Sequence, residues 1–249
     1  TPELRKAFND SLPDVSAFQS ELGQNLGLYA KYKALAALPA FPAWNEAKRT
    51  AVNNAIRDFK LSGAELHEAG KKRFADIENR LAALSAKFSE NVLDATDAYN
   101  LVIEDKAQLP GVPEDVLLMW QENAKAAGKT GWKVTLQAPS FLPLMQYCSN
   151  RALREELYKA NVTKASEFGP AEQDNAPLIR ERLVLIKEKA ALLGYKNYAE
   201  LSLVPKMADK PEDVISFLRD LAVKSKPFAL KDRKELEDFA RDKLGLQTL

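Results

Sequence analysis

The chain has 249 residues, of which 46% are hydrophobic and 29% are charged, so it can bury one large core or two modest cores beneath a solvated surface. Its 36 Lys and Arg against 35 Asp and Glu leave a net charge of +1, which excludes a strong general attraction to nucleic acid or to anionic membranes. No apolar run reaches the roughly 18 residues of a membrane span, and a single cysteine excludes an intramolecular disulfide and fits a reducing compartment.

The first residues, TPELRKAFND, lack both an initiator Met and an apolar signal core, which indicates a processed end or a cut within a longer protein. Helices are predicted at 2–12, 14–38 and 45–61. Pro13 is expected to kink or break the first pair, because proline has no backbone N–H to donate and its ring collides with the preceding turn of a helix.

The strongest helical signal covers residues 68–98. Its apolar side chains recur in alternating steps of three and four: Phe74, Ile77, Leu81, Leu84 and Phe88. We call these five residues the seam. Such steps keep side chains on one side of a helix, so the pattern predicts a long helix with one buried face. In a soluble chain that face must be covered by neighbouring helices, and this helix is therefore the expected spine of the fold.

The pattern changes between residues 100 and 138. Two short runs rich in Val, Ile, Thr and Trp, at 101–103 and 132–136, flank the turn-rich LPGVPED and a helix predicted at 114–127. They predict a small two-stranded element whose strands pair with each other.

Helices are again predicted at 151–166, 179–193 and 230–244, with the segment 167–176, EFGPAEQDNA, as the best candidate for a surface loop. Pro177 suits the first turn of the middle helix, and Gly194 suits the position just past its end. That helix repeats the spacing of the seam and is one candidate partner for it. The repeating side chains are Ile179, Leu183, Ile186, Ala190 and Leu193.

A further helix start is predicted at residues 209–212, which resemble a capping box with Asp209 as the cap. The apolar side chains that follow are spaced i, i+3, i+4 and i+7, as on one side of a helix. They are Val214, Phe217, Leu218 and Leu221.

The stretch LHEAGKKRF, residues 66–74, looks like the His-Glu-x-x-His motif of zinc peptidases broken at its last position. In that motif two His residues four apart share one helical face and reach one metal, with the Glu as general base. Here Lys71 takes the place of the second His, and an ammonium does not normally ligate zinc. His67 is the only histidine of the chain. We interpret the stretch as an exposed polar helix start.

The other sequence motifs that could bind a nucleotide or supply a nucleophile are also incomplete. The segment AAGKTG, residues 126–131, ends like a Walker motif but lacks its first glycine and a preceding strand. A Ser-His-Asp arrangement would have to use His67, and no Gly-x-Ser-x-Gly elbow exists. Cys148, the only cysteine, lies among aromatic and aliphatic residues and is interpreted as a buried inert thiol rather than a nucleophile.

The remaining polar and aromatic candidates have ordinary structural interpretations. Paired carboxylates occur at 155–156, 94–97 and 235–238. They lie in helical stretches, and we interpret them as residues on solvent-exposed faces of those helices. Trp44, Trp120 and Trp132 could line a groove, although aromatic residues at helical spacing more often belong to a core. Composition and periodicity alone therefore predict a soluble, mostly helical segment with no complete active site.

Two longer segments resemble the thimet-oligopeptidase family of zinc peptidases. Residues 139–169, PSFLPLMQYCSNRALREELYKANVTKASEFG, are similar to a family stretch in which a strand is followed by a Pro-aromatic-x-Pro turn, Met-x-x-Cys, a polar cap and an Arg-rich helix. Residues 192–218 resemble the family's Leu-Gly-aromatic-x-x-Tyr-Ala turn and Lys-Met-Ala segment. Together with VNNAIRDFKLSGAEL and FSENVLDATDAY upstream, the similarity covers essentially the whole chain in the same order.

The resemblance implies a two-lobed helical ellipsoid with a deep channel between the lobes. Zinc is held in one lobe by a His-Glu-x-x-His helix and a downstream Glu, in the second half of a much longer protein. Zinc-bound water would cleave the peptide bond with a Glu as general base. This chain corresponds to roughly the middle of the N-terminal half, so it would form most of the opposite wall. The resemblance carries no catalytic, cofactor-binding or metal-ligating residue onto it.

For the parent protein, the resemblance implies short peptide substrates, a zinc ion not ligated by this chain, and a C-terminal catalytic lobe as the partner. A cytoplasmic monomer that binds neither nucleic acid nor membrane is expected. Within the chain we expect a long-helix part at 1–99, a small β-plus-helix insert at 100–138 and a second helical part at 139–249. The alternative is a non-enzymatic helical scaffold or peptide-binding module, which the sequence after residue 249 would distinguish.

Overall fold

The computed structural model describes residues 1–246, and in this part of the chain ten α-helices accompany one two-stranded sheet. The mainly α fold class predicted from the sequence is confirmed. The elements are α1 (Pro2–Gly23), α2 (Leu26–Ala36), α3 (Glu46–Leu61), α4 (Glu68–Ala98), β1 (Asn100–Ile103), α5 (Glu114–Ala126), β2 (Trp132–Thr135), α6 (Ala138–Tyr147), α7 (Arg151–Thr163), α8 (Ala176–Leu192), α9 (Tyr198–Leu203) and α10 (Pro211–Leu244).

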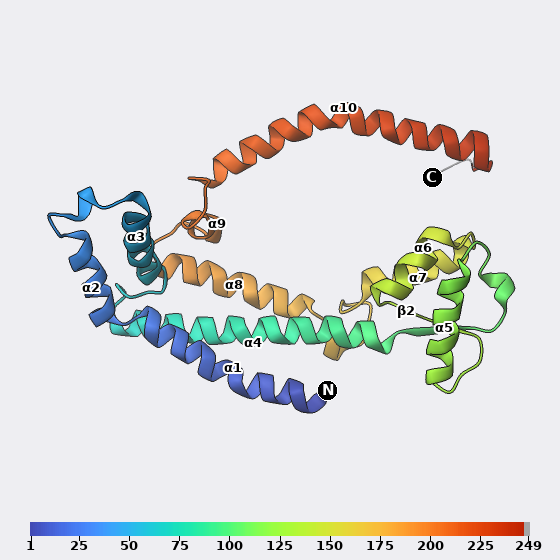
Figure 1. Cartoon of the computed structure of the whole chain (residues 1–249), viewed down its shortest axis with the longest axis horizontal. Coiled ribbons are helices and arrows are strands. Elements are labelled where there is room, and N and C mark those ends of the chain that lie inside the picture. Colours follow the sequence, from blue (N-terminus) through green and yellow to red (C-terminus); the bar gives the residue numbers. More distant parts are fainter. Residues whose placement is uncertain (247–249) are drawn as a thin grey trace.

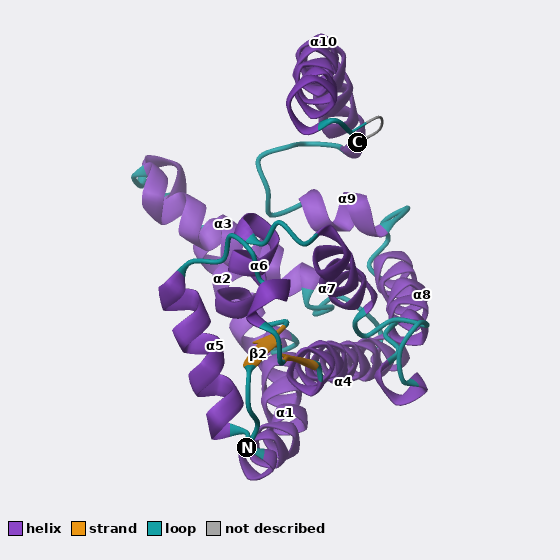
Figure 2. Cartoon of the chain, turned by 90° about the vertical axis from the view of Figure 1, so that its right-hand side faces the viewer, coloured by secondary structure: helices purple, strands orange, loops and turns teal. Residues whose placement is uncertain are grey.

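Helix α4 is the spine along which the other elements are arranged (Figure 1). Helix α1 lies along one side of α4 and α8 along another. The pair α2 and α3 stands at one end, while the sheet with α5, α6 and α7 occupies the other end. Helix α10 forms a separate outer layer, tied to the rest by a loop from α9 (Figures 1 and 2).

The predicted seam of α4 is buried over most of its length. Phe74, Ile77 and Leu84 are buried, and Leu81 is half-buried in the same cluster. Phe88, at the far end of the seam, is 40% exposed. The spine and its buried face are therefore confirmed, although the Phe88 side chain is only partly covered.

Helix α8 packs on α4 as predicted, but with a different face. Leu178, Leu185 and Leu192, spaced seven apart, join the cluster around Ile77 and Leu84. The predicted face was wrong at its N-terminal end, where Ile179 and Leu183 are 45% and 57% exposed. The helix carries two overlapping apolar patterns, and the seven-residue step matches the contact line between two packed helices better.

Helix α1 runs through Pro13, so of the predicted kink or break, the break does not occur. Asn9 before the proline donates to Glu90 of α4 at 2.7 Å, and Ser16 after it is buried. Contacts on both sides of Pro13 thus offset the hydrogen bond that proline cannot make. The chain breaks instead at Asn25, whose side chain accepts from the Leu28 N–H at 2.9 Å and begins α2.

The predicted two-stranded element is confirmed. Strands β1 and β2 pair antiparallel, with Leu101 opposite Val134. They cover a core whose buried members include Trp120 of α5, Leu144 of α6 and Leu157 of α7. This core holds the far end of the molecule together independently of the α4 seam.

The Pro-aromatic-x-Pro segment forms helix α6 and not the expected turn. Pro139 lies in the first turn, where a helix needs no backbone N–H from that residue. Pro143 then removes only one hydrogen bond of the ladder, and the buried side chains of Ser140 and Leu144 keep the segment packed. Helix α7 ends at Thr163, three residues before its predicted end at residue 166.

Helix α10 is one continuous helix through Pro227, although separate helices were predicted. Pro227 removes the hydrogen bond to the carbonyl of Val223, a residue that is 73% exposed. The predicted cap was wrong as well: Lys210 occupies the cap position, and no side chain caps the first turn. The helix ends at Leu244, and Gly245 follows it with a φ of 67°, the left-handed conformation that glycine adopts without strain.

Truncation of the seam should destabilise the fold. We expect Leu84→Ala to cost about 2–5 kcal/mol of unfolding free energy, because it opens a cavity between α4 and α8. Lys87→Ala on the exposed side of the same helix should cost under about 0.5 kcal/mol. Denaturant melts of the two variants measure the difference, and equally small losses would show that Leu84 is not in a packed core.

Candidate functional site

The broken motif lies at the start of α4, and its residues make local contacts. His67 is the cap residue, and its Nδ1 atom accepts a hydrogen bond from the Gly70 N–H at 3.1 Å. The Lys71 Nζ atom lies 3.2 Å from a Glu68 carboxylate oxygen. One imidazole nitrogen used as a cap, next to an ammonium group, does not fit a zinc site.

Within residues 1–246, no group of three or more His, Cys, Asp and Glu side chains could hold a metal ion. Cys148 is buried in the core beside the sheet, where its thiol faces the Gln108 carbonyl oxygen at 3.7 Å. The Gly128-Lys129-Thr130 segment is a turn that ends α5, with Gly128 at a φ of 66°.

The tryptophans divide between two environments. Trp120 is fully buried, and Trp132 packs against the same core. Trp44 is half-buried and lies against the ring of Phe41, with the ring centroids 5.4 Å apart. The core interpretation is confirmed for Trp120 and Trp132.

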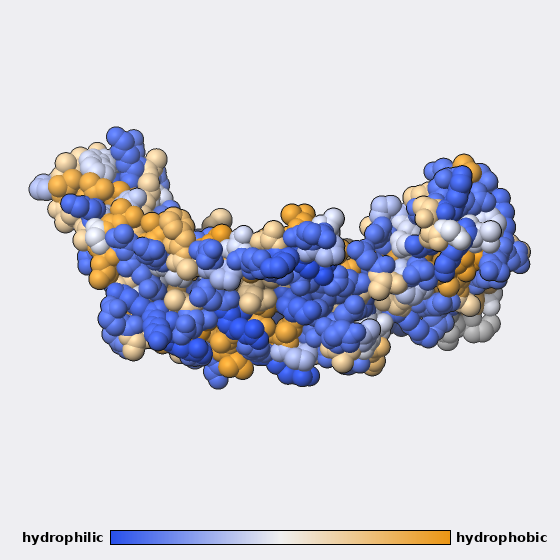
Figure 3. Space-filling view, turned by 90° about the horizontal axis from the view of Figure 1, so that it is seen from below, coloured by the Kyte–Doolittle hydropathy of each residue, from blue (hydrophilic) through white to orange (hydrophobic). Residues whose placement is uncertain are grey.

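An open groove with a volume of about 1350 Å³ lies between α1 and α4. Large apolar side chains line its α1 side: Leu4, Phe8 and Leu12. Small side chains line its α4 side: Ala82, Ser85, Ala86 and Ser89. The face of the molecule seen from the α1 side is mostly hydrophilic, with separate hydrophobic patches (Figure 3).

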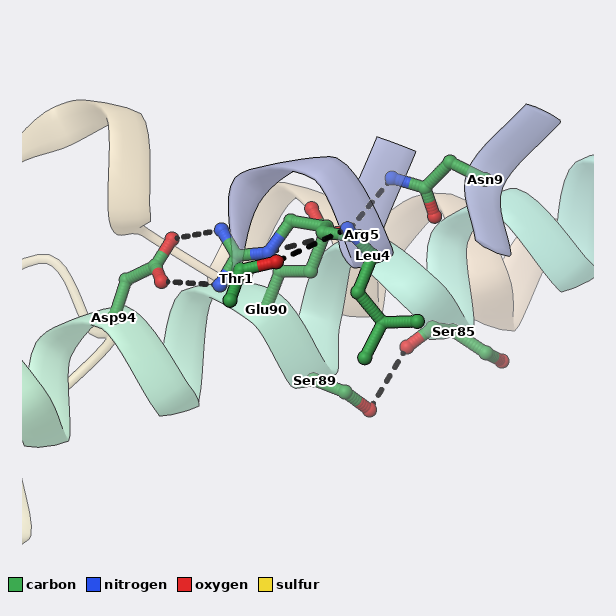
Figure 4. Close-up of polar contacts among 8 residues, drawn as sticks. All are labelled: Thr1, Leu4, Arg5, Asn9, Ser85, Ser89, Glu90 and Asp94. Atoms are coloured by element: carbon green, nitrogen blue, oxygen red, sulfur yellow. Dashed lines mark hydrogen bonds and ion pairs between the residues drawn. The ribbon is translucent and has the colours of Figure 1, made fainter. Parts of the chain in front are cut away.

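An ion pair fastens the outer end of this groove (Figure 4). Arg5 of α1 donates two hydrogen bonds to Asp94 of α4, at 2.6 and 2.8 Å. Asn9 donates to Glu90 one turn away on α4. The interpretation of Asp94 as part of a solvated face was therefore incomplete, because this carboxylate docks α1, and no local pattern links it to a residue 89 positions away.

The hydrogen bonds between Arg5 and Asp94 shift the pKa values of both groups. Donation from Arg5 holds the pKa of the Asp94 carboxyl below its ordinary value of 3.8, and the same contact raises the pKa of the Arg5 guanidinium. Ser89 donates to the Ser85 carbonyl at 3.1 Å, so its hydroxyl serves the helix (Figure 4). The arrangement holds two helices together and presents apolar surface, and it places no base next to a nucleophile.

A second hollow, of about 630 Å³, lies where α1, α3, α4 and α8 meet. Four charged side chains line it: Asp58, Glu78, Arg182 and Lys189. The Lys189 Nζ atom lies 2.8 Å from Glu78 and 5.2 Å from the centre of the Phe74 ring. Arg182 donates to the Ser85 hydroxyl at 2.8 Å. Lys189 and Arg182 thus join α8 to α4, whereas Asp58 of α3 pairs with the adjacent Arg57 at 2.8 Å.

Two family models match the chain. The model for the N-terminal domain of neurolysin and thimet oligopeptidase matches residues 1–72, and the model for Peptidase family M3 matches residues 144–249. The chain is 43% identical to oligopeptidase A of Haemophilus influenzae over 99% of its own length, and 41% identical to oligopeptidase A of Escherichia coli over 100%. Saccharolysin of Saccharomyces cerevisiae is 30% identical over 76% of the chain.

Along its whole length the helical chain is therefore similar to proteins of one class, the oligopeptidases. It belongs to the thimet-oligopeptidase family, Peptidase family M3. The chain spans 37% of the length of the two oligopeptidases A. No helix among residues 1–246 combines the length and the apolar composition needed to cross a membrane.

The α1–α4 ion pair should make stability depend on pH in acid. Because the pKa of Asp94 is lowered in the folded state, its contribution is present above its ordinary value of 3.8 and is lost as the pH falls through the folded pKa. We therefore expect Asp94→Asn to lower Tm at neutral pH, with a difference from the unmodified chain that shrinks below pH 3.8. Thermal melts followed by circular dichroism at several pH values measure this.

The matched control is Asp97→Asn, because Asp97 lies on the same helix and accepts only from Gln137 among the described side chains. It should change Tm less than Asp94→Asn. A Tm difference for Asp94→Asn that stayed constant down to the acid limit would contradict the assignment of this ion pair.

Substitution of His67 should affect the helix start and not peptide hydrolysis. We expect His67→Ala to cost about 0.5–1 kcal/mol of stability through the lost cap. The peptidase activity of a complete polypeptide carrying this change should stay within about twofold, since a lost general acid or base costs roughly a hundredfold or more. A hundredfold loss of kcat/KM would show that His67 takes part in the reaction.

Proposed function

We propose that this chain is part of a zinc-dependent oligopeptidase and forms the wall that faces the zinc site across a channel. The observation that carries the proposal is the similarity to two bacterial oligopeptidases A along the full length of the chain. Similarity of this extent, in one continuous order, is much more specific than any short motif. The zinc ligands and the catalytic Glu are assigned to the part of the relatives' length that this chain does not span.

The proposed substrates are short peptides. A channel between two lobes admits an extended peptide and excludes a folded protein by its width, so selectivity follows from shape. The wall built on α4 suits that role, since α1 and α8 hold the spine by an apolar contact and by ion pairs at several points. The three parts at 1–99, 100–138 and 139–249 would be subdivisions of this lobe.

We further propose that the parent protein is a cytoplasmic monomer. Oligopeptide cleavage fits a compartment in which short peptides arise from protein turnover, and one free cysteine suits a reducing environment. A non-enzymatic helical scaffold or peptide-binding module is the competing function, and it makes the opposite prediction for zinc.

A zinc and activity measurement separates the two. The 249-residue chain should bind no stoichiometric zinc after dialysis and should not cleave a short quenched fluorescent peptide. The complete polypeptide should bind zinc and cleave that peptide, and a chelator should abolish the cleavage. Stoichiometric zinc or chelator-sensitive turnover in the 249-residue chain would contradict the assignment, and a complete polypeptide with neither would favour the scaffold.

A further inference from the structure

The hollow of about 630 Å³ at the meeting of α1, α3, α4 and α8 contains polar side chains that the fold leaves without partners. We call it the polar hollow. Helix α1 contributes Ser16, Gln19 and Ser20 to its lining. Within residues 1–246 the side-chain hydrogen bonds of α1 come from residues nearer its start, and these three side chains make none. Polar groups that line a concave surface without bonding to one another are available to a ligand.

The polar hollow is elongated along α4. On this helix the lining extends from Phe74 to Ser85, which is about 16 Å of helix. Helix α8, which lies beside α4 in Figure 1, lines it with Arg182, Ile186 and Lys189. Steps of four and three residues keep these side chains on one side of α8. The polar hollow can therefore hold an extended molecule that runs parallel to α4.

The two cations of α8 differ in their partners. Lys189 lies 2.8 Å from the Glu78 carboxylate, so this pair is neutral as a whole. Arg182 donates to the Ser85 hydroxyl at 2.8 Å, and within residues 1–246 it pairs with no carboxylate. A guanidinium has five N–H donors and binds a carboxylate with two parallel hydrogen bonds. Arg182 therefore gives one end of the polar hollow an affinity for a carboxylate.

The other end of the polar hollow has a carboxylate of its own. The Oδ1 atom of Asp58 accepts from the adjacent Arg57 at 2.8 Å, and among the described residues Oδ2 accepts no hydrogen bond. The end of α3 lies beside the start of α4, because the Gln24 amide donates to the Ser62 carbonyl at 3.4 Å and to the Lys71 carbonyl at 3.5 Å. An acceptor for a cation thus lies toward the start of α4, away from the guanidinium.

We propose that the polar hollow binds a short peptide with free ends, its C-terminal carboxylate on Arg182 and its N-terminal ammonium group at Asp58. Four extended residues span at most about 14 Å, which matches the lining along α4. Hydroxyl and amide side chains both donate and accept, as the backbone of a peptide requires. The apolar side chains of Phe74 and Ile186 offer contacts to the side chains of the peptide.

The inference goes beyond the proposed function, because this site binds a peptide without zinc and without cleavage. The charges and the length of the polar hollow define an extended molecule with a cation at one end and a carboxylate at the other. The choice of a peptide among such molecules rests on the proposed function, in which short peptides are substrates and products.

Calorimetric titration with tetraalanine tests the site on the 249-residue chain. We expect saturable binding at one site, at least about tenfold weaker for tetraalanine amide, which cannot make two charge-assisted hydrogen bonds to Arg182. Arg182→Ala should weaken binding of the free acid at least about tenfold and remove the preference for acid over amide. The matched control is Arg180→Ala, because Arg180 is exposed on the same helix and does not line the polar hollow. It should change the affinity less than about twofold, and circular dichroism checks that both variants fold.

The other end of the peptide has its own test. Asp58→Asn should weaken binding of tetraalanine and leave binding of N-acetyl-tetraalanine unchanged, because the acetyl group removes the ammonium charge. Absence of saturable binding to the unmodified chain would overturn the inference, and so would equal affinities for the acid and the amide. Acetate that competed as well as tetraalanine would show a site for simple carboxylates and overturn the peptide assignment.

The complete polypeptide, treated with a chelator so that tetraalanine is not cleaved, extends the test to the parent protein. Arg182→Ala should weaken binding there as well, and binding that did not depend on Arg182 would overturn the inference. Zinc content and hydrolysis are measured on untreated samples of the same protein. Their absence would contradict the proposed function, whereas binding that depends on Arg182 would still support the site.

Discussion

The antiparallel contact between α4 and α8 is the interaction on which the rest of the structure depends. Leu178, Leu185 and Leu192 enter the seam around Ile77 and Leu84, which removes a continuous strip of apolar surface from water. A buried hydrogen bond of 2.9 Å between the Asn91 and Asn175 amides then fixes the register, since a slip would leave both amides without a partner. The exposed Arg73–Glu188 and Arg80–Glu181 pairs select the same register but add little stability.

Features set by local chemistry could be predicted from the sequence. The bounds of α4, the start of α3 at Asn45 and the end of α8 before Gly194 follow from apolar spacing and from side chains that cap helices. Features set by distant contacts could not. Helix α1 continues through Pro13 because α4 holds it on both sides, and Asp94 pairs with Arg5 across 89 positions of sequence. The face of α8 that is buried depends on which of two apolar patterns meets its partner.

The broken zinc motif shows why a spacing needs its structural context. Helix α4 begins at Glu68, so His67 stands at the cap, where its Nδ1 atom is already engaged by the Gly70 N–H. Two ligands four residues apart share a helical face only when both lie inside the helix. The assignment to a peptidase family came from long ordered similarity, because the functional contribution proposed for this chain is the shape of a wall. The shape of such a wall depends on how its helices pack, so it cannot be predicted from a single residue or a short motif.

Hydrogen exchange along the chain tests the central claim most directly, that α4 and α8 form a self-sufficient core and that α10 lies outside it. In the 249-residue chain, amides between Phe74 and Leu84 and around Leu185 should exchange most slowly, because their helices open only on global unfolding. Amides between Phe217 and Phe239 should exchange rapidly in this chain, because the apolar side chains of α10 are largely exposed. Protection of α10 equal to that of α4 in the 249-residue chain would contradict the account.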